Sequence, residues 1–138
     1  MRDKRLFVSI ILAAAALAAC QPKSASVEVV PVTGGSYRNV SASELQMMMS
    51  SKDFLLINVH IPFAGNIVGT DASIPYDQIE QELSRLPPDK AAKIVLYCKS
   101  GRMSAIAAES LVQMGYTDVW NLKGGMGEWE QAGLSLER

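Results

Sequence analysis

The most restrictive feature of the sequence is residues 93–114, KIVLYCKSGRMSAIAAESLVQM. The apolar residues 94–97 end in Cys98, and a polar loop follows that consists of Lys99, Ser100, Gly101 and Arg102. After this loop, apolar side chains recur at helical spacing, at Met103, Ala107, Leu111 and Met114. A short apolar run bounded by turn residues is typical of a buried strand, and the later spacing is typical of an amphipathic helix. The pattern predicts that Cys98 lies where a strand passes into a helix.

The thiol of Cys98 is predicted to be reactive. At the start of a helix several backbone N–H groups lack intrahelical partners, and the helix dipole adds positive potential. Lys99 and Arg102 add two cations. Such surroundings favour the thiolate, which is the nucleophilic form of cysteine. The alternative is a small core residue, since free cysteines are frequently buried. A core cysteine would have apolar neighbours on both sides, whereas Cys98 is followed at once by polar residues, so we interpret it as a nucleophile.

Segments across most of the chain resemble one known family. Residues 97–104, YCKSGRMS, resemble the active-site loop of the rhodanese (sulfurtransferase) family, commonly written C-x-S-G-x-R-S. Residues 55–60 resemble the family's L-I-D-V-R strand, residues 67–75 its H-I-x-G-A and I-P segments, and residues 115–129 its G-y-x-x-V and L-x-G-G-x-x-x-W segments. The resemblance extends over residues 37–138. It implies an α/β, rhodanese-like fold with a small parallel sheet and helices on both faces.

The order of apolar segments agrees with such a fold. Strands are predicted at residues 37–40, 54–59, 94–97 and 118–122, and helices at residues 77–86, 103–114 and 126–132. A further helix is predicted behind a capping box at residues 41–44, with Leu45, Met48 and Met49 at helical spacing. Alternating strands and helices predict a parallel sheet covered on both faces. Ligands of such sheets bind beyond the carboxyl ends of the strands. Asn58, His60 and Cys98 are therefore expected to face one pocket, with Asn58 and His60 as candidates for its wall.

The resemblance implies persulfide chemistry with Cys98 as the catalytic residue. Cys98 would take a sulfane sulfur from a donor such as thiosulfate or polysulfide and pass it to a thiol or to cyanide. Backbone N–H groups of residues 99–103 would stabilise the anionic persulfide. The expected substrate-binding loop consists of Lys99, Ser100, Gly101, Arg102, Met103 and Ser104. No cofactor and no metal are expected, because a single histidine and one available cysteine cannot make a typical zinc site.

Four positions depart from the family pattern: Asn58 replaces Asp, His60 replaces Arg, Asn66 replaces His, and Met103 replaces the last Arg of the loop. Arg102 is expected to become the main fixed cation at the pocket mouth. Three alternatives to a sulfurtransferase remain. One is a non-catalytic, rhodanese-like binding lipoprotein. Another is a phosphatase or arsenate reductase, which requires Arg six positions after the cysteine, where Ser104 stands. The third is a redox-sensing thiol, for which the domain lacks a second, resolving cysteine.

The start of the chain has the layout of a signal peptide. Cations precede an apolar run that is too short for an ordinary membrane span, and the run ends in LAAC, which resembles the bacterial lipobox. We predict a lipoprotein signal peptide at residues 1–19, a lipidated Cys20 with a flexible tether at residues 20–36, and a rhodanese-like domain at residues 37–138. The partly alternating residues 27–30 leave open a short edge strand within the tether. The alternative is an uncleaved anchor or a buried helix.

The location and partners of the protein follow from this layout. The expected location is the cell envelope, with the lipid in the outer membrane and the domain facing the periplasm, since Gln21 rather than Asp follows the lipidated cysteine. The bilayer is then a partner.

At 138 residues and 49% hydrophobic, the chain is long enough for one domain with a hydrophobic core. The net charge of −1, with no long basic run, argues against a nucleic-acid partner.

Overall fold

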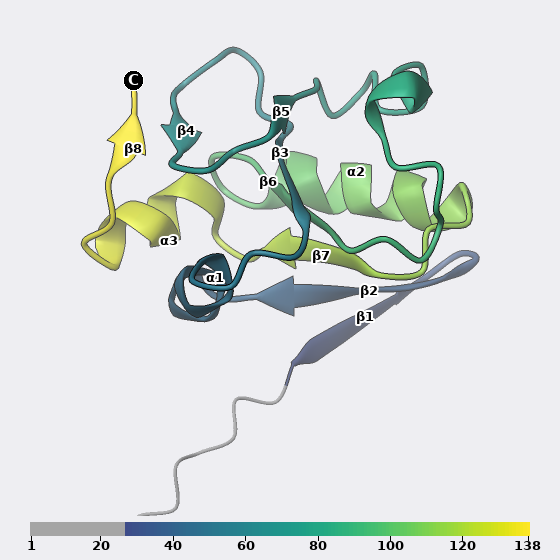
Figure 1. Ribbon diagram of the computed structural model, residues 1–138, viewed down its shortest axis with the longest axis horizontal. Helices are drawn as coiled ribbons and strands as arrows, with labels where there is room; N and C mark the ends of the chain where they lie inside the picture. The colour runs from purple at the N-terminus through teal and green to yellow at the C-terminus, as the bar shows by residue number, and fades with distance from the viewer. Residues whose placement is uncertain (1–26) are drawn as a thin grey trace, which may run out of the picture.

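A six-stranded sheet forms the centre of the computed structural model, which describes residues 27–138 (Figure 1). In spatial order its strands are β1 (Glu28–Val32), β2 (Gly35–Val40), β7 (Val119–Leu122), β6 (Ile94–Tyr97), β3 (Leu55–Asn58) and β5 (Ala72–Ser73). Neighbouring strands from β2 to β5 run parallel, and β1 pairs antiparallel with β2. A second, two-stranded sheet joins β4 (Asn66–Ile67) to β8 (Leu136–Glu137). The predicted α/β fold with a mostly parallel sheet is confirmed.

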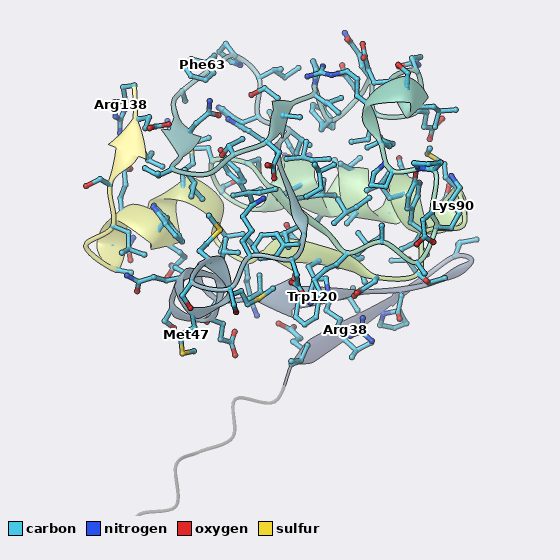
Figure 2. All side chains as sticks on the ribbon, in the orientation of Figure 1. Arg38, Met47, Phe63, Lys90, Trp120 and Arg138 are labelled. Carbon is cyan, nitrogen blue, oxygen red and sulfur yellow. The ribbon has the colours of Figure 1, made fainter. Side chains whose placement is uncertain are left out.

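Helices cover both faces of the sheet. Helix α2 (Arg102–Gln113) packs on one face, and helices α1 (Ala42–Met49) and α3 (Gly125–Gln131) pack on the other. Alternate residues of a strand point to opposite faces. In β6, Leu96 therefore joins the apolar cluster under α2, whereas Tyr97 joins the cluster under α1 and α3. Side chains fill both interlayer spaces (Figure 2).

Local sequence signals place the ends of α1 and α2 as expected. The hydroxyl of Ser41 accepts the N–H of Glu44, and the Glu44 carboxylate accepts the N–H of Ser41 at 2.8 Å, which completes a capping box. Gly115 follows the C-cap of helix α2, Met114, and its φ of +93° disfavours other residues. The N–H of Gly115 donates to the Val112 carbonyl and that of Tyr116 to the Leu111 carbonyl, both at 3.0 Å, as in a Schellman motif.

The helix predicted at residues 77–86 is wrong. This segment consists of turns and one short 3₁₀ helix, η1 (Leu83–Arg85). Leu83 is 52% exposed, so the apolar spacing of the segment does not correspond to a continuous buried face. Leu86 is extended, as expected for a residue that precedes proline. A short helix needs a packed apolar face to persist, and this segment lacks one.

The sheet also begins earlier than predicted. Residues 20–36 were expected to be a tether, but β1 pairs with β2 and brings Val30 opposite Tyr37. Gly34, with a φ of +91°, makes the tight turn between the two strands. The short edge strand that the sequence allowed within this segment is thus present as β1. The predicted signal peptide (1–19), Cys20 and residues 21–26 lie outside the described residues.

None of the helices described within residues 27–138 is long and apolar enough to span a bilayer.

The methionines of α1 differ in their surroundings. Met48 and Met49 pack against the apolar cluster under α1 and α3, whereas Met47 is 66% exposed and points outward (Figure 2). Helix α1 thus contributes two flexible apolar side chains to the core.

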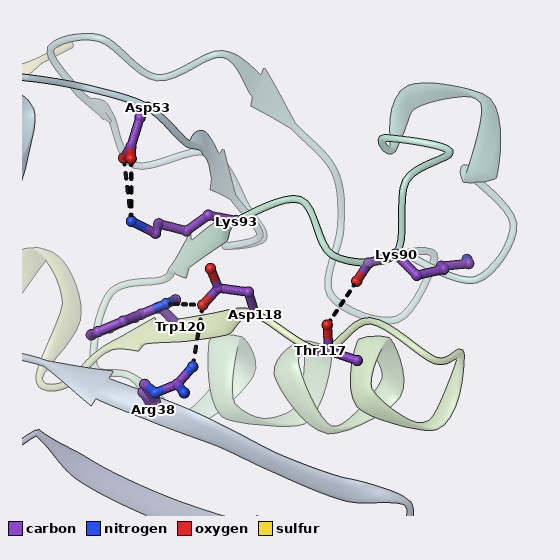
Figure 3. Close-up of polar contacts among 7 residues, drawn as sticks. All are labelled: Arg38, Asp53, Lys90, Lys93, Thr117, Asp118 and Trp120. Atoms are coloured by element: carbon purple, nitrogen blue, oxygen red, sulfur yellow. Dashed lines mark hydrogen bonds and ion pairs between the residues drawn. The ribbon is translucent and has the colours of Figure 1, made fainter.

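A polar cluster joins the hairpin strand β2 to β7 (Figure 3). The Arg38 guanidinium pairs with the Asp118 carboxylate at 3.2 Å and lies 5.4 Å from the centre of the Trp120 ring. The Trp120 indole N–H donates to the same carboxylate at 2.6 Å. Partly exposed ion pairs of this kind contribute at most about 1 kcal/mol, so the cluster mainly sets how the hairpin lies on the sheet. Asp118 precedes β7 and Cys98 follows β6, so the cluster and the thiol lie at opposite ends of the sheet.

Candidate active site around Cys98

Two hydrogen-bond donors point at the sulfur of Cys98. The thiol lies between the end of β6 and the start of α2, and the residue is 1% exposed. The backbone N–H of Gly101 donates to Sγ at 3.0 Å, and the hydroxyl of Ser104 lies within hydrogen-bond distance of Sγ, at 3.4 Å, and of the Gly101 carbonyl oxygen, at 3.2 Å, so its one proton is shared between two acceptors. Gly101 has a φ of +94°, which permits the loop to turn its N–H toward the sulfur. Both donors would stabilise negative charge on the thiolate form of Sγ.

Helix α3 holds the backbone of this loop. The N–H of Met126 donates to the Cys98 carbonyl at 2.9 Å, and the N–H of Gly127 donates to the Lys99 carbonyl at 3.0 Å. The first N–H groups of a helix lack partners within the helix, so the loop carbonyls satisfy two of them. Gly125, with a φ of +58°, lies against the same carbonyls: an added Cβ would overlap the Cys98 oxygen and lie 2.8 Å from the Lys99 carbonyl carbon.

Sequence reasoning missed this support. It treated Gly124 and Gly125 only as part of a family motif and assigned them no contact with Cys98. The available signal was the pair of glycines directly after the last strand of the parallel sheet, where a backbone often approaches another backbone closely. In the structure, this glycine pair allows α3 to begin against the thiol loop.

The remaining loop residues face different surroundings. Lys99 and Ser100 are exposed and, with His60, Glu128 and Gln131, line a depression that we call the loop hollow. Arg102 is exposed at the start of α2 and lines neither this hollow nor the one described below, and Met103 packs against the apolar cluster under α2. Of the two cations of the loop, Lys99 lines the loop hollow, and the expectation that Arg102 is the main fixed cation at the pocket mouth stays a prediction. Of the backbone N–H groups of residues 99–103, the one that donates to Sγ in the structure is that of Gly101.

Asn58 organises a neighbouring loop and does not line the loop hollow, contrary to expectation. The residue is 2% exposed. Its Nδ2 donates to the Gly65 carbonyl and to Oδ1 of Asn66, both at 2.9 Å, and its Oδ1 accepts the N–H of His60 at 3.0 Å. A carboxylate cannot donate, so an Asp at this position would face two acceptors. The two departures from the family pattern at positions 58 and 66 therefore belong together.

His60 lines the loop hollow, as expected for a residue at the carboxyl end of β3. Its Nδ1 is buried and has no hydrogen-bond partner among residues 27–138. Burial and the nearby Lys99 ammonium hold the pKa of His60 below its usual value. The imidazole is thus neutral at neutral pH and contributes no cation to the hollow.

The structure is an α/β domain with a candidate nucleophilic thiol. This thiol lies at a strand-to-helix junction, and two donors are directed at its sulfur. The sequence profile of the Rhodanese-like domain matches residues 41–132, so the chain belongs to the rhodanese-like family. The family inferred from the motifs is confirmed.

Known proteins similar to this chain include sulfurtransferases. A sulfurtransferase of Allochromatium vinosum is 33% identical over 98 residues, which are 70% of this chain and 90% of that protein. The thiosulfate sulfurtransferase GlpE of Pseudoalteromonas translucida is 26% identical over 104 residues, 70% of this chain and 92% of that protein. The crystal structure of a rhodanese-related protein from Thermoplasma volcanium superposes with a TM-score of 0.62 at 28% identity, and the match covers 72% of this chain and 97% of that chain. The family and these relatives support a sulfurtransferase role.

Proposed function

We propose that the protein is a sulfurtransferase that carries a sulfane sulfur as a persulfide on Cys98. Donors such as thiosulfate or polysulfide would supply the sulfur, and a thiol or cyanide would accept it. The observation that carries the proposal is the pair of donors on the Cys98 sulfur, the Gly101 N–H and the Ser104 hydroxyl. Both favour the thiolate, which attacks the donor in the first step and leaves in the second. The relatives named as sulfurtransferases add independent support.

The reaction has two displacements at sulfur. First, the Cys98 thiolate attacks the outer sulfur of the donor; with thiosulfate the S–S bond breaks, and sulfite leaves with the electron pair. Cys98 then carries Cys–S–S⁻. Second, the acceptor thiolate or cyanide attacks the outer sulfur, the Cys98 S–S bond breaks, and the Cys98 thiolate leaves. The Gly101 N–H and the Ser104 hydroxyl stabilise the thiolate before and after each cycle.

The approach to the sulfur leads through the loop. Because Cys98 is 1% exposed, residues 99–101 have to shift before a donor atom can reach Sγ. The loop hollow lies directly beside this segment, since Lys99 and Ser100 line it. We therefore assign the loop hollow to the donor before transfer.

The alternatives fit the site less well. A non-catalytic binding lipoprotein gives no reason for two donors on a buried thiol. A phosphatase needs an arginine at position 104 to hold the oxyanion, and Ser104 instead donates its hydroxyl to Sγ. Sulfur transfer accounts for both contacts.

Mass spectrometry of the intact protein tests the function. After treatment with thiosulfate or polysulfide, the protein should gain the mass of one sulfur atom, and peptide mapping should place it on Cys98. Addition of cyanide or a thiol should remove it. If no sulfur is gained from either donor, the protein does not act as a sulfurtransferase.

We further propose that a lipid on Cys20 anchors the protein to the outer membrane, facing the periplasm. The lipobox-like LAAC sequence supports this. The Cys20→Ala variant should accumulate as an uncleaved precursor, because the cysteine that receives the lipid is absent, and the wild-type protein should fractionate with membranes. Immunoblotting of cell fractions measures both. Normal processing of Cys20→Ala would rule out the lipoprotein route.

A further inference from the structure

The described chain enters the domain at the edge of the sheet where the thiol lies. Strand β1 is antiparallel to β2, and its first residue, Glu28, lies opposite Asn39, near the carboxyl end of β2. The Glu28 carboxylate accepts hydrogen bonds from the Lys123 ammonium at 2.7 Å and from the Asn39 amide at 3.2 Å. A second depression, the adjoining hollow, continues from the loop hollow at Ser100, and Glu28 lines it. The entry point is therefore beside the thiol loop.

Three exposed apolar side chains lie near this entry point. Val27 is 43% exposed and Val29 is 56% exposed. Val29 lies opposite Arg38, which points to the same face of the sheet as Val40, the face that α1 and α3 cover. Met47 of α1 is 66% exposed, and it lies with Arg38 on the side of the molecule where the described chain begins (Figure 2). We call the side chains of Val27, Val29 and Met47 the anchor-side surface.

The chain between Cys20 and Glu28 is too short to let this side of the domain turn away from a bilayer. Glu28 follows Cys20 by eight positions, and a fully extended chain of that length spans at most about 28 Å. A folded domain of the size of residues 27–138 has a diameter of roughly 34 Å. If the entry point faced away from the bilayer, the connecting residues would have to reach past the whole domain, which they cannot do.

We propose that the anchor-side surface docks on the bilayer, with Val27, Val29 and Met47 inserted at its interface. The inference rests on the proposed lipid on Cys20 and is independent of sulfur transfer. Three partly exposed side chains do not hold a soluble protein on a membrane by themselves, because stable anchoring needs a lipid chain together with a second attraction. Once the lipid holds the domain within reach, the contact is intramolecular, so a weak surface suffices.

Docking of this surface would fix how the thiol loop lies relative to the membrane. Strand β1 begins at the edge of the sheet where β6 ends, and Glu28 and Ser100 line the same hollow. The loop that carries Cys98 would therefore open close to the bilayer. The side of the sheet that carries β5 and η1 would face away from it (Figure 1).

Brominated phospholipids test the contact. The lipidated protein would be placed in phosphatidylcholine vesicles with or without bromine on the acyl chains, and the variant Val29→Trp would report the depth of this position. Its emission, after subtraction of the wild-type signal, should fall about twofold with the brominated lipid, because docked apolar side chains reach the boundary between headgroups and acyl chains. Leu83→Trp is the matched control. Leu83 is 52% exposed and lies on η1, away from β1, so its emission should not change.

A second substitution tests whether the three side chains act together. Met47→Glu, added to Val29→Trp, should abolish most of the quenching, because a carboxylate is costly to remove from water. Phe63→Glu is the control for this change. Phe63 is 63% exposed, close to the value for Met47, and lies near the C-terminus on another side of the molecule (Figure 2). This variant should keep the quenching of Val29→Trp.

The outcomes separate docking from anchoring. If Cys20 carries lipid and the protein binds vesicles, but Val29→Trp is quenched no more than Leu83→Trp, docking is wrong and the anchor stands. Quenching that persists in Met47→Glu would also overturn the surface as defined. Emission of Val29→Trp that is blue-shifted equally with both lipids would indicate that a second copy of the chain covers the surface, which overturns docking. If the mass of the mature protein shows no lipid on Cys20, the proposed anchor fails, and docking fails with it.

Discussion

Substituting Cys98 by serine is expected to lower the rate of sulfur transfer at least about a thousandfold, because a serine hydroxyl is a far weaker nucleophile and forms no persulfide. The fold should persist. A hydroxyl at this position can still accept the Gly101 N–H, so the free energy of unfolding should change by no more than about 1 kcal/mol. Steady-state transfer to cyanide and thermal unfolding measure the two effects.

The matched control is the other cysteine of the chain. Cys20→Ser replaces the cysteine that we propose to be lipidated, which is remote in sequence from the active-site loop, and should leave the transfer rate of the purified protein unchanged. Substantial transfer by Cys98→Ser would show that another group carries the sulfur. The two hydrogen bonds to Sγ would then have a structural role and no catalytic one.

Substituting Gly125 by alanine is expected to damage both stability and transfer. An added Cβ would overlap the Cys98 carbonyl, and the φ of +58° is unfavourable for alanine. The loop or α3 must then move, which should cost about 3 kcal/mol or more of folding free energy. A shift of the loop by about 1 Å can lower a rate about a hundredfold, because it misplaces the nucleophile. Chemical unfolding and the rate of transfer per folded protein measure these effects separately.

Gly133→Ala separates the clash from the backbone strain. Gly133 also has a positive φ, +79°, but an added Cβ there meets no heavy atom within 4 Å. This variant should lose only about 1 kcal/mol and keep full activity. Equal behaviour of the two variants would mean that the contact between Gly125 and the loop carbonyls does not position Cys98.

Some elements were predictable because their signals are local. The end of α2 follows from Gly115, and the start of α1 follows from Ser41 and Glu44, since each signal acts within one turn of the helix. The helix expected at residues 77–86 failed for the opposite reason. Its apolar spacing is helical, but whether Leu83 is buried depends on the neighbouring elements, and here it remains exposed.

The site divides in a similar way. A polar loop after a buried run placed Cys98 between a strand and a helix, as the structure shows. Which of the two loop cations lines the loop hollow was not predictable. Lys99 and Arg102 are three residues apart, and the direction of each side chain depends on how the loop turns at Gly101 and packs against α3. Asn58 gave no local sign that its amide would hold residues 65 and 66.

By itself, the sequence determined the family, the parallel arrangement of the central strands and the position of the thiol at the carboxyl end of β6. These depend on periodicity, turn residues and motif spacing, which are properties of short segments. The tertiary structure alone decided which groups surround the sulfur and what charge the loop hollow carries. Lys99, His60 and Glu128 come from three different elements, and only packing brings an ammonium, a neutral imidazole and a carboxylate to the same surface. Such an arrangement cannot be inferred from short segments, because electrostatic interaction depends on distance in space and not on distance along the chain.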